Sequence, residues 1–141
     1  MTRESIVDFF AQRQQYWAAR DADGLASSNA IDGTVVSPMF KQVRGREAIA
    51  TSYRRLFETF PDWGFESEAL IIDGDRVAQP FSASATHVGE FMGLPGTGRR
   101  FQVQGVRLFR LADELIQEER RVYDFTALLI QIGVLRSKPG Y

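Results

Sequence analysis

The sequence predicts an α+β domain in which helices come first and a curved antiparallel sheet comes second. Apolar residues recur at helical spacing over residues 4–20 and 46–60, the period becomes strand-like after residue 65, and turn residues separate the later strands. This order of elements requires the helices to cover one face of the sheet. A sheet that curves around helices encloses a conical internal cavity, and small-molecule sites are concave and mostly apolar.

Length, charge and composition limit the possible functions. A chain of 141 residues fits one domain, which we place at residues 1–134, followed by a polar tail at 135–141. The 17 basic and 18 acidic side chains give no positive excess, so we expect no nucleic-acid partner. The absence of cysteine excludes thiolate catalysis and disulfides. Apolar runs stay far below the ~20 residues of a membrane span, so we expect a cytoplasmic protein without a membrane partner.

The first helix is predicted at residues 4–20. Its apolar stripe consists of Ile6, Phe9, Phe10, Tyr16 and Trp17, and its polar face is expected to carry Arg13, Gln14 and Arg20. A short helical continuation is predicted within residues 21–30, around Leu25. A brief strand should follow at residues 31–38 and end at Pro38, which cannot donate to a ladder. Residues 39–45 are expected to form a loop.

The second helix is predicted at residues 46–60. One stripe of this helix carries Ile49, Tyr53, Leu56, Phe57 and Phe60, and Pro61 prevents its continuation. The following segment should contain four consecutive antiparallel strands, at residues 65–72, 76–87, 101–111 and 115–123. Asp73 and Gly74 suit the tight turn between the first two. A last apolar helix is expected to begin after Asp124, as its N-cap, and to end at Gly133.

Alternation along residues 101–110 separates the two faces of the third strand. The more apolar face, which we place inward, carries Phe101, Val103, Gly105, Arg107 and Phe109. Arg107 is the exception in this row, because a buried guanidinium requires a carboxylate or a ligand. The outward row contains Gln102, Gln104, Val106 and Leu108, and we expect a homodimer to form through this outer face of the sheet.

The fourth strand offers a carboxylate for this arginine. By the same alternation, Gln117, Glu119, Arg121 and Tyr123 share one face. If that face is inward, Glu119 lies beside Arg107 and Arg121, and its pKa is lowered, as suits a permanent anion. If it is outward, the same residues form a ladder of ion pairs in solvent. The sequence leaves both arrangements open.

Several motifs in order resemble a known family. They are GREAIATSYRRLFETFPDW, THVGEFMGLPGTGRRF, VRLFRLADELIQEERRVYDF and LLIQIG. Together they are similar to the SnoaL-like polyketide cyclases, a branch of the NTF2-like superfamily, from the first helix to Gly133. This resemblance implies a cone-shaped α+β barrel with an interior cavity, often a homo-oligomer, that works without a metal or an organic cofactor.

The resemblance also shows a departure at the catalytic positions. The family members that close a ring by aldol condensation use an aspartate on the last strand and a histidine on the strand before it. Arg121 and Arg107 stand at those two positions here. Arginine cannot act as a base at physiological pH, so Glu119, Asp124 or His87 would have to move the proton. His87 is the only histidine and lies at the start of a glycine-rich loop that we interpret as the rim of the cavity.

The predicted function is therefore cofactor-free acid–base ring closure or isomerisation, with the arginines stabilising an oxyanion. Two alternatives remain: a hydroxylase or epoxide-opening enzyme of the same family, and a non-catalytic binding or dimerisation module. The expected partner is a hydrophobic, aromatic or polyketide-like small molecule. The aromatic residues expected to line its site are Trp17, Tyr53, Trp63, Phe91, Phe101 and Tyr123. One histidine and scattered carboxylates predict no metal site.

Overall fold

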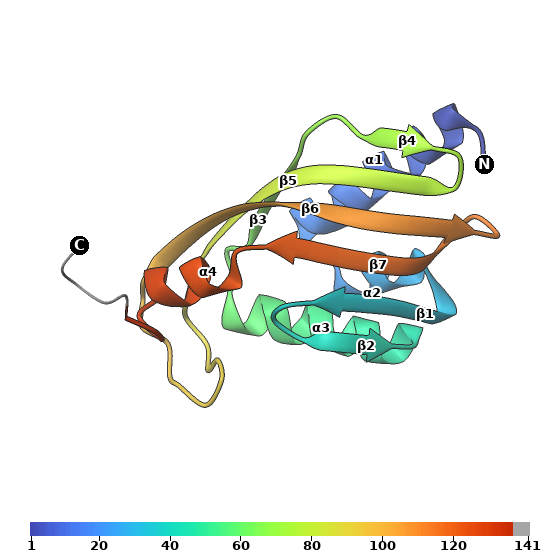
Figure 1. The fold of residues 1–141 in the computed structure, drawn as a ribbon. Coiled ribbons are helices and arrows are strands. Elements are labelled where there is room, and N and C mark those ends of the chain that lie inside the picture. The colour runs from blue at the N-terminus through green and yellow to red at the C-terminus, as the bar shows by residue number, and fades with distance from the viewer. Residues whose placement is uncertain (137–141) are drawn as a thin grey trace.

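The computed structural model describes residues 1–136 as four helices and one seven-stranded sheet (Figure 1). The helices are α1 (Arg3–Ala19), α2 (Ala22–Ser27), α3 (Arg46–Thr59) and α4 (Phe125–Gln131). The strands are β1 (Asn29–Ser37), β2 (Lys41–Arg44), β3 (Gly64–Ser67), β4 (Ile71–Asp73), β5 (Arg76–Thr86), β6 (Arg100–Ala112) and β7 (Leu115–Tyr123). Most of the tail predicted at 135–141 lies outside the described residues.

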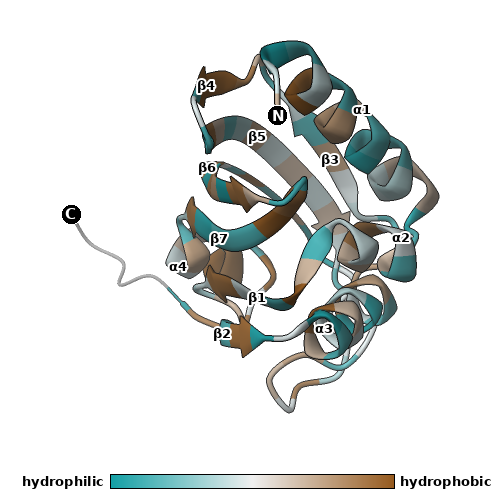
Figure 2. Cartoon of the chain, turned by 90° about the vertical axis from the view of Figure 1, so that its right-hand side faces the viewer, coloured by the Kyte–Doolittle hydropathy of each residue, from teal (hydrophilic) through white to brown (hydrophobic). Residues whose placement is uncertain are grey.

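The predicted α+β fold is confirmed. The sheet has the order β2-β1-β7-β6-β5-β3, with β4 paired to β5, and it is strongly curved (Figure 1). Viewed along the sheet, α1, α2 and α3 lie on the same side of it (Figure 2). The long strands β5, β6 and β7 are antiparallel, as predicted, and their register places Arg107 opposite Arg121. The helices and the inner face of these strands therefore enclose the core.

The structure corrects three predictions about the strands. The loop predicted at 39–45 contains β2, which pairs with β1. The strand predicted at 65–72 is divided into β3 and β4 by residues 68–70, which belong to neither strand. The sheet is also not wholly antiparallel, since β1 pairs in parallel with β7. Parallel neighbours need a long connection, and the local pattern of β1 does not show which distant strand it joins.

The capping residues explain where the helices begin and end. The side chain of Thr2 accepts a hydrogen bond from the Ser5 N–H at 3.0 Å at the start of α1, and Arg20 ends it in a left-handed conformation. Pro61 follows α3 as predicted. Asp124 is the N-cap of α4, and its carboxylate accepts from the Ala127 N–H at 2.9 Å. Within residues 1–136, none of the helices has the length and apolar character that crossing a membrane requires.

The residue least well predicted from sequence is Arg13. It was expected on the solvent-exposed face of α1, but its side chain is only 2% exposed. The buried residues of α1 are Ile6, Phe10, Arg13 and Trp17. Their spacing follows the helical period, so Arg13 occupies a position on the apolar stripe. It is buried because polar groups of α2 and α3 receive its hydrogen bonds there.

Candidate functional site

A cluster of buried charges lies between the helices and the inner face of β6 and β7. Glu119 is at its centre and is contacted by arginines from three elements. Arg121 Nε donates to Glu119 Oε2 at 2.6 Å, and Arg107 Nη1 donates to the same oxygen at 3.1 Å. Arg13 Nη2 lies 3.9 Å from Oε1. The alternation on β6 and β7 is thus inward for both strands, and the solvent-exposed ladder is excluded.

Tyr53 of α3 joins two of these arginines. Its hydroxyl oxygen accepts from Arg121 Nη2 at 2.9 Å and from Arg13 Nη2 at 3.4 Å. Arg13 Nη1 also donates to the Leu25 carbonyl at 3.3 Å and to the Ser28 hydroxyl. These bonds connect α1, α2, α3 and β7 around one carboxylate. The cluster is therefore held in place by every layer of the fold.

Aromatic rings enclose the guanidinium of Arg107. Its central carbon lies 4.7 Å from the ring centroids of Trp17 and Phe65 and 5.1 Å from that of Phe81. Rings at these distances stabilise a cation through their negative faces. Trp17 and Phe65 also stack on each other, with centroids 4.7 Å apart. This aromatic wall holds Arg107 away from water while leaving it charged.

Burial and the neighbouring charges shift the pKa values of the cluster in different directions. Burial alone would raise the pKa of Glu119, but the charges of Arg121, Arg107 and Arg13 lower it to about 2. The pKa of Arg121 is raised, because attraction to Glu119 outweighs its burial. The pKa of Arg107 is lowered to about 10 by burial and by repulsion from Arg121. All three groups remain charged at neutral pH. Repulsion within the cluster disfavours the charged form of Arg107 and is one cause of its lowered pKa.

A small cavity opens beside the two strand arginines. Its lining includes Trp63, Phe81, Arg107, Arg121 and Tyr123, and its volume is about 20 Å³. This volume suffices for about one water molecule. The predicted internal cavity is therefore present at the predicted strands, but in this conformation it is much smaller than a polyketide.

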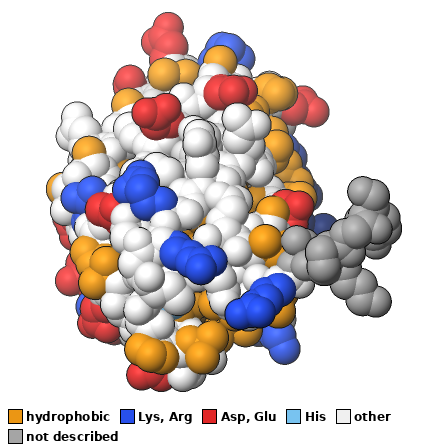
Figure 3. All heavy atoms as spheres, turned by 90° about the vertical axis from the view of Figure 1, so that its left-hand side faces the viewer, with side chains coloured by type: hydrophobic (Ala, Val, Ile, Leu, Met, Phe, Trp, Pro, Cys, Tyr) orange, Lys and Arg blue, Asp and Glu red, His pale blue; other side chains and the backbone are white. Residues whose placement is uncertain are grey.

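A larger groove adjoins this cavity on the outside. It has a volume of about 360 Å³ and runs between α3 and the loop that carries Phe91 and Met92. Met39, Phe40 and Leu56 line both the groove and the inner cavity. The turn between β1 and β2 thus separates the two spaces. Figure 3 shows this end of the molecule, where hydrophobic side chains are exposed along the lower edge.

His87 lies at the rim but does not join the arginines. It is fully buried, and its Nδ1 accepts from the Thr97 N–H at 3.3 Å and lies 3.1 Å from the Thr97 hydroxyl oxygen. That hydroxyl donates to the Ile132 carbonyl at 2.8 Å. Nε2 has no hydrogen-bond partner among residues 1–136, and the centroid of the imidazole ring lies 6.0 Å from that of the Phe60 ring and 6.1 Å from that of the Phe91 ring. Thr97 therefore connects His87 to the end of α4.

The other predicted site residues divide into two groups. Trp17 and Tyr53 contact the arginines of the charged cluster, and Trp63 and Tyr123 line its cavity. Phe91 lines the outer groove instead, and Phe101 packs against Phe60 and Trp63 in the core. Asp124 is exposed and caps α4, so it is not part of the charged cluster. Burial raises the pKa of Tyr123, which keeps its phenol protonated at neutral pH.

Arg13, Met39 and Phe40 are among the residues of the site that were not singled out from the sequence, and so are Phe65 and Phe81 of the aromatic wall. Arg13 follows Phe10 by three positions and precedes Trp17 by four, and this spacing was the signal that could have placed it inward. Met39 and Phe40 lie in a short turn, where no periodic pattern exists. Their position over the cavity depends on the pairing of β1 with β7, which local sequence does not reveal.

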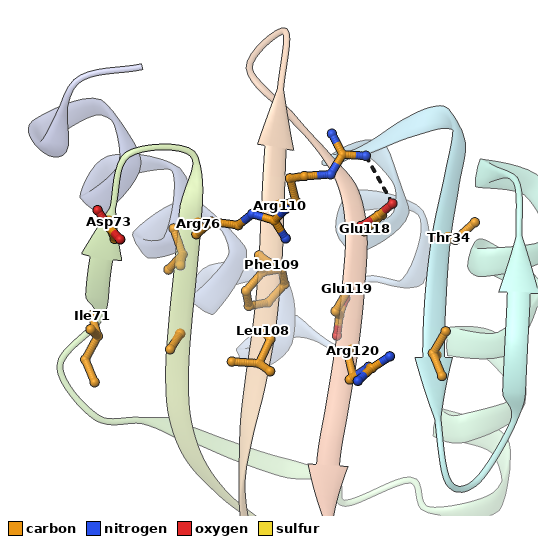
Figure 4. Close-up of a pocket in the computed structure, with 13 residues that line it drawn as sticks. Thr34, Ile71, Asp73, Arg76, Leu108, Phe109, Arg110, Glu118, Glu119 and Arg120 are labelled. Atoms are coloured by element: carbon orange, nitrogen blue, oxygen red, sulfur yellow. Dashed lines mark hydrogen bonds and ion pairs between the residues drawn. The ribbon is translucent and has the colours of Figure 1, made fainter.

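A hollow of about 660 Å³ lies on the opposite face of the sheet (Figure 4). Leu108, Arg110, Glu118 and Arg120 are among its lining residues, and Arg110 pairs with Glu118 at 3.1 Å. Glu119 and Phe109 border it only from beneath, because their side chains are buried on the inner face. This outer hollow is open to solvent. The sheet itself separates it from the charged cluster.

Comparison with known proteins agrees with this architecture. A family model described as SnoaL-like polyketide cyclase matches residues 7–132. The chain belongs to the SnoaL-like polyketide cyclase family. Among solved SnoaL-like and related folds, AclR, a proposed hydroxylase from Streptomyces galilaeus, is 25% identical with a TM-score of 0.82, over 98% of this chain and 87% of AclR. TsrD from Streptomyces laurentii is 24% identical with a TM-score of 0.83, over 96% and 99%, and supports the fold alone.

Curated relatives of this SnoaL-like chain are named as cyclases. Aklanonic acid methyl ester cyclase DnrD from Streptomyces peucetius is 30% identical over 98 residues, which are 65% of this chain and 64% of DnrD. Nogalonic acid methyl ester cyclase from Streptomyces nogalater is 43% identical over 47 residues, or 33% of this chain and 35% of that protein. The chain thus spans less than two thirds of the length of these relatives.

Proposed function

We propose that this protein is a cofactor-free cyclase or isomerase of polyketide-like small molecules. The observation that carries the proposal is the pair Arg107 and Arg121, which line one apolar cavity while sharing the carboxylate of Glu119. Donors fixed in a water-poor site stabilise a developing oxyanion more effectively than water does. The names of the curated relatives, which are ring-closing enzymes, support the same class of reaction.

Each residue has a distinct role in this proposal. Arg107 and Arg121 stabilise the enolate oxygen and the alkoxide that forms when the new carbon–carbon bond closes the ring. Glu119 orients both guanidinium groups. Because its pKa is low, it is ionised at neutral pH and does not donate a proton in the reaction. Tyr123 lines the cavity with a protonated phenol and can donate a hydrogen bond to the same oxygen. Trp63 and Phe81 provide apolar walls for the ring system.

The test is turnover of aklanonic acid methyl ester, the compound named for a relative, by matched variants of β6. Arg107→Met removes the inner charge, and Arg110→Met removes a charge from the outer face of the same strand. We expect Arg107→Met to lower kcat by roughly 10²–10³-fold, as when one oxyanion donor is removed, and Arg110→Met to retain turnover. Arg107→Lys should restore part of the activity. Equal activity of all variants would contradict the proposal.

The mass of the product separates this function from its alternative in the same family. Ring closure by aldol addition gives a product of unchanged mass, whereas hydroxylation adds one oxygen atom. We expect no added oxygen, and a mass increase by one oxygen would favour the hydroxylase. The alternative is supported by the similarity to AclR, a proposed hydroxylase, at 25% identity over most of the chain.

We also propose that two copies associate through the outer face of the sheet. Exposed apolar side chains on strands of the sheet support this. More than a third of the surface is accessible in Val36, Ile71, Leu108 and Val122. Analytical ultracentrifugation should show a dimer in the wild type and a monomer after Leu108→Lys, with Ser27→Lys as a control away from the sheet. A monomeric wild type at micromolar concentration would contradict it.

A further inference from the structure

The charged cluster holds more positive than negative charge. Three guanidinium groups, from Arg13, Arg107 and Arg121, surround the single carboxylate of Glu119, and all four side chains are buried. The net charge of the cluster is therefore plus two at neutral pH. Aromatic rings and the Tyr53 hydroxyl stabilise these cations but bring no negative charge. Buried charge of one sign favours a ligand of the opposite sign.

The excess positive charge borders the inner cavity. Arg107 and Arg121 line the inner cavity, whereas Arg13 does not line it and donates to Leu25, Ser28 and Tyr53. The Nε atom of Arg107 is buried and has no hydrogen-bond partner among residues 1–136. A negatively charged oxygen beside this atom would satisfy the donor and also offset the repulsion from Arg121. The geometry thus points to an anion next to Arg107.

The same cavity offers no group suited to removing a proton at neutral pH. Glu119 is the only carboxylate in its cluster, and its pKa of about 2 makes it a weak base. Tyr123 is held protonated by burial. Among the described residues, His87 and Asp124 are the remaining predicted proton carriers, and neither lines this cavity. An enzyme with strong oxyanion donors but without such a base suits a substrate that has already lost its proton.

We infer that the protein binds its substrate as a preformed enolate: a planar apolar molecule with an acidic enol or β-dicarbonyl group, ionised in solution before it enters the site. The inference rests on the proposed function, because it uses the same cavity. The enolate oxygen would lie against Arg107 and Arg121. The enolate carbon then bonds to the acceptor carbonyl carbon, whose electron pair moves to its oxygen. One proton taken up by that alkoxide replaces the one lost before binding.

The groove supplies the room that the inner cavity lacks. Its volume of about 360 Å³ lies within the usual range of roughly 300–1,000 Å³ for small-molecule sites. Because Met39, Phe40 and Leu56 line both spaces, displacement of the turn that carries Met39 and Phe40 would join them. The charged end of the ligand would then contact the arginines while its rings occupy the groove.

A matched pair of probes tests the inference without any turnover. 2-Hydroxy-1,4-naphthoquinone is an ionised enol at neutral pH, and 2-methoxy-1,4-naphthoquinone has the same ring system but cannot ionise. Isothermal titration calorimetry should show about 10- to 100-fold tighter binding of the hydroxy compound, the value of a hydrogen bond to a charged group. Lowering the pH until the enol is protonated should remove this preference.

Variants locate the effect. Arg107→Met should abolish the preference for the ionised probe, Arg107→Lys should retain part of it, and Arg110→Met on the outer face should leave it unchanged. Equal affinity of the wild type for both probes, or binding of neither, would overturn the inference. Either result would leave the proposed ring closure to be judged by its own product assay. Conversely, enolate preference without any ring-closing activity would preserve the anion site and reject the cyclase.

Discussion

Two neighbouring glutamates on β7 form ion pairs of the same length in opposite environments. Glu118 pairs with Arg110 at 3.1 Å on the outer face, and its side chain is 56% exposed. Glu119 pairs with Arg107 at 3.1 Å on the inner face, and its side chain is 0% exposed. Both pairs join β6 to β7. The separation of the charges is equal, so any difference in their behaviour must come from their surroundings.

Water makes the two pairs energetically different. Solvent and salt screen the exposed pair, and such pairs contribute little to stability. The buried pair interacts through a medium of lower polarisability, where attraction is stronger and an unpaired charge is costly. The comparison teaches that the position of a charge relative to the sheet, rather than its distance from a partner, decides what it can do. Only on the inner face is positive charge unscreened by solvent and so available to attract a ligand.

The largest expected effect comes from removing the central carboxylate. Glu119→Gln leaves three buried arginines without a counter-charge, and we expect the free energy of unfolding to fall by about 3–5 kcal/mol. The matched change Glu118→Gln should stay within the error of the measurement. Urea denaturation followed by tryptophan fluorescence provides both values. Similar losses for the two variants would show that burial does not distinguish the pairs.

The second prediction is that the stability of the protein falls at acidic pH as Glu119 becomes protonated. The pKa of Glu119 is lowered from 4.5 to about 2 in the folded protein, so its contribution to stability is complete above pH 4.5. It is lost as the pH falls from 4.5 towards 2, because the unfolded chain binds the proton first. The loss attributable to Glu119 is about 3 kcal/mol.

The measurement is the difference between wild type and Glu119→Gln in urea denaturation at pH 7, 5, 4 and 3. We expect this difference to be constant above pH 5 and to shrink below it. Glu118→Gln serves as the exposed control, with a much smaller change over the same range. A difference that persists unchanged at pH 3 would mean that Glu119 is not stabilised as an anion.

The third prediction tests the link between the cluster and α3. Tyr53→Phe removes the hydroxyl that accepts from Arg121 and Arg13, and should lower the free energy of unfolding by about 1.5–3 kcal/mol. Tyr16→Phe is the control, because its half-buried ring carries a hydroxyl without a side-chain hydrogen bond among the described residues. Thermal unfolding of both variants gives the comparison. If Tyr53→Phe unfolds like the wild type, the Tyr53 hydroxyl does not stabilise the cluster.

The smallest effect is expected from an exposed carboxylate that bonds to backbone. Asp124→Ala should cost about 1 kcal/mol, because it removes the N-cap acceptor of α4. Asp124→Asn keeps an acceptor oxygen and should unfold like the wild type. The same pair also separates two roles of Asp124 in the turnover assay. Loss of turnover in Asp124→Asn at unchanged stability would identify a proton carrier instead of a cap.

The candidate site was partly predictable, because alternation along a strand depends only on local geometry. Counting residues placed Arg107 on the inner face of β6 and put Glu119 and Arg121 on one shared face of β7, whose direction it left open; the structure has all three side chains inward. Arg13 was placed wrongly, because a charged side chain on an apolar stripe is normally assigned to solvent. Its partners in α2 and α3 are remote in sequence, so nothing local indicates that they can receive its hydrogen bonds.

The sequence by itself determined the family, the α+β order of elements, the second long helix and which residues of a strand share one face. These features follow from short-range periodicity and from motifs, which a linear chain carries in full. Only the tertiary structure decided that β1 lies parallel beside β7, that three arginines meet at one carboxylate and that Met39 and Phe40 close the cavity. Those features depend on contacts between distant segments. The net charge of a buried cluster, and so the ligand it favours, exists only after the chain has folded.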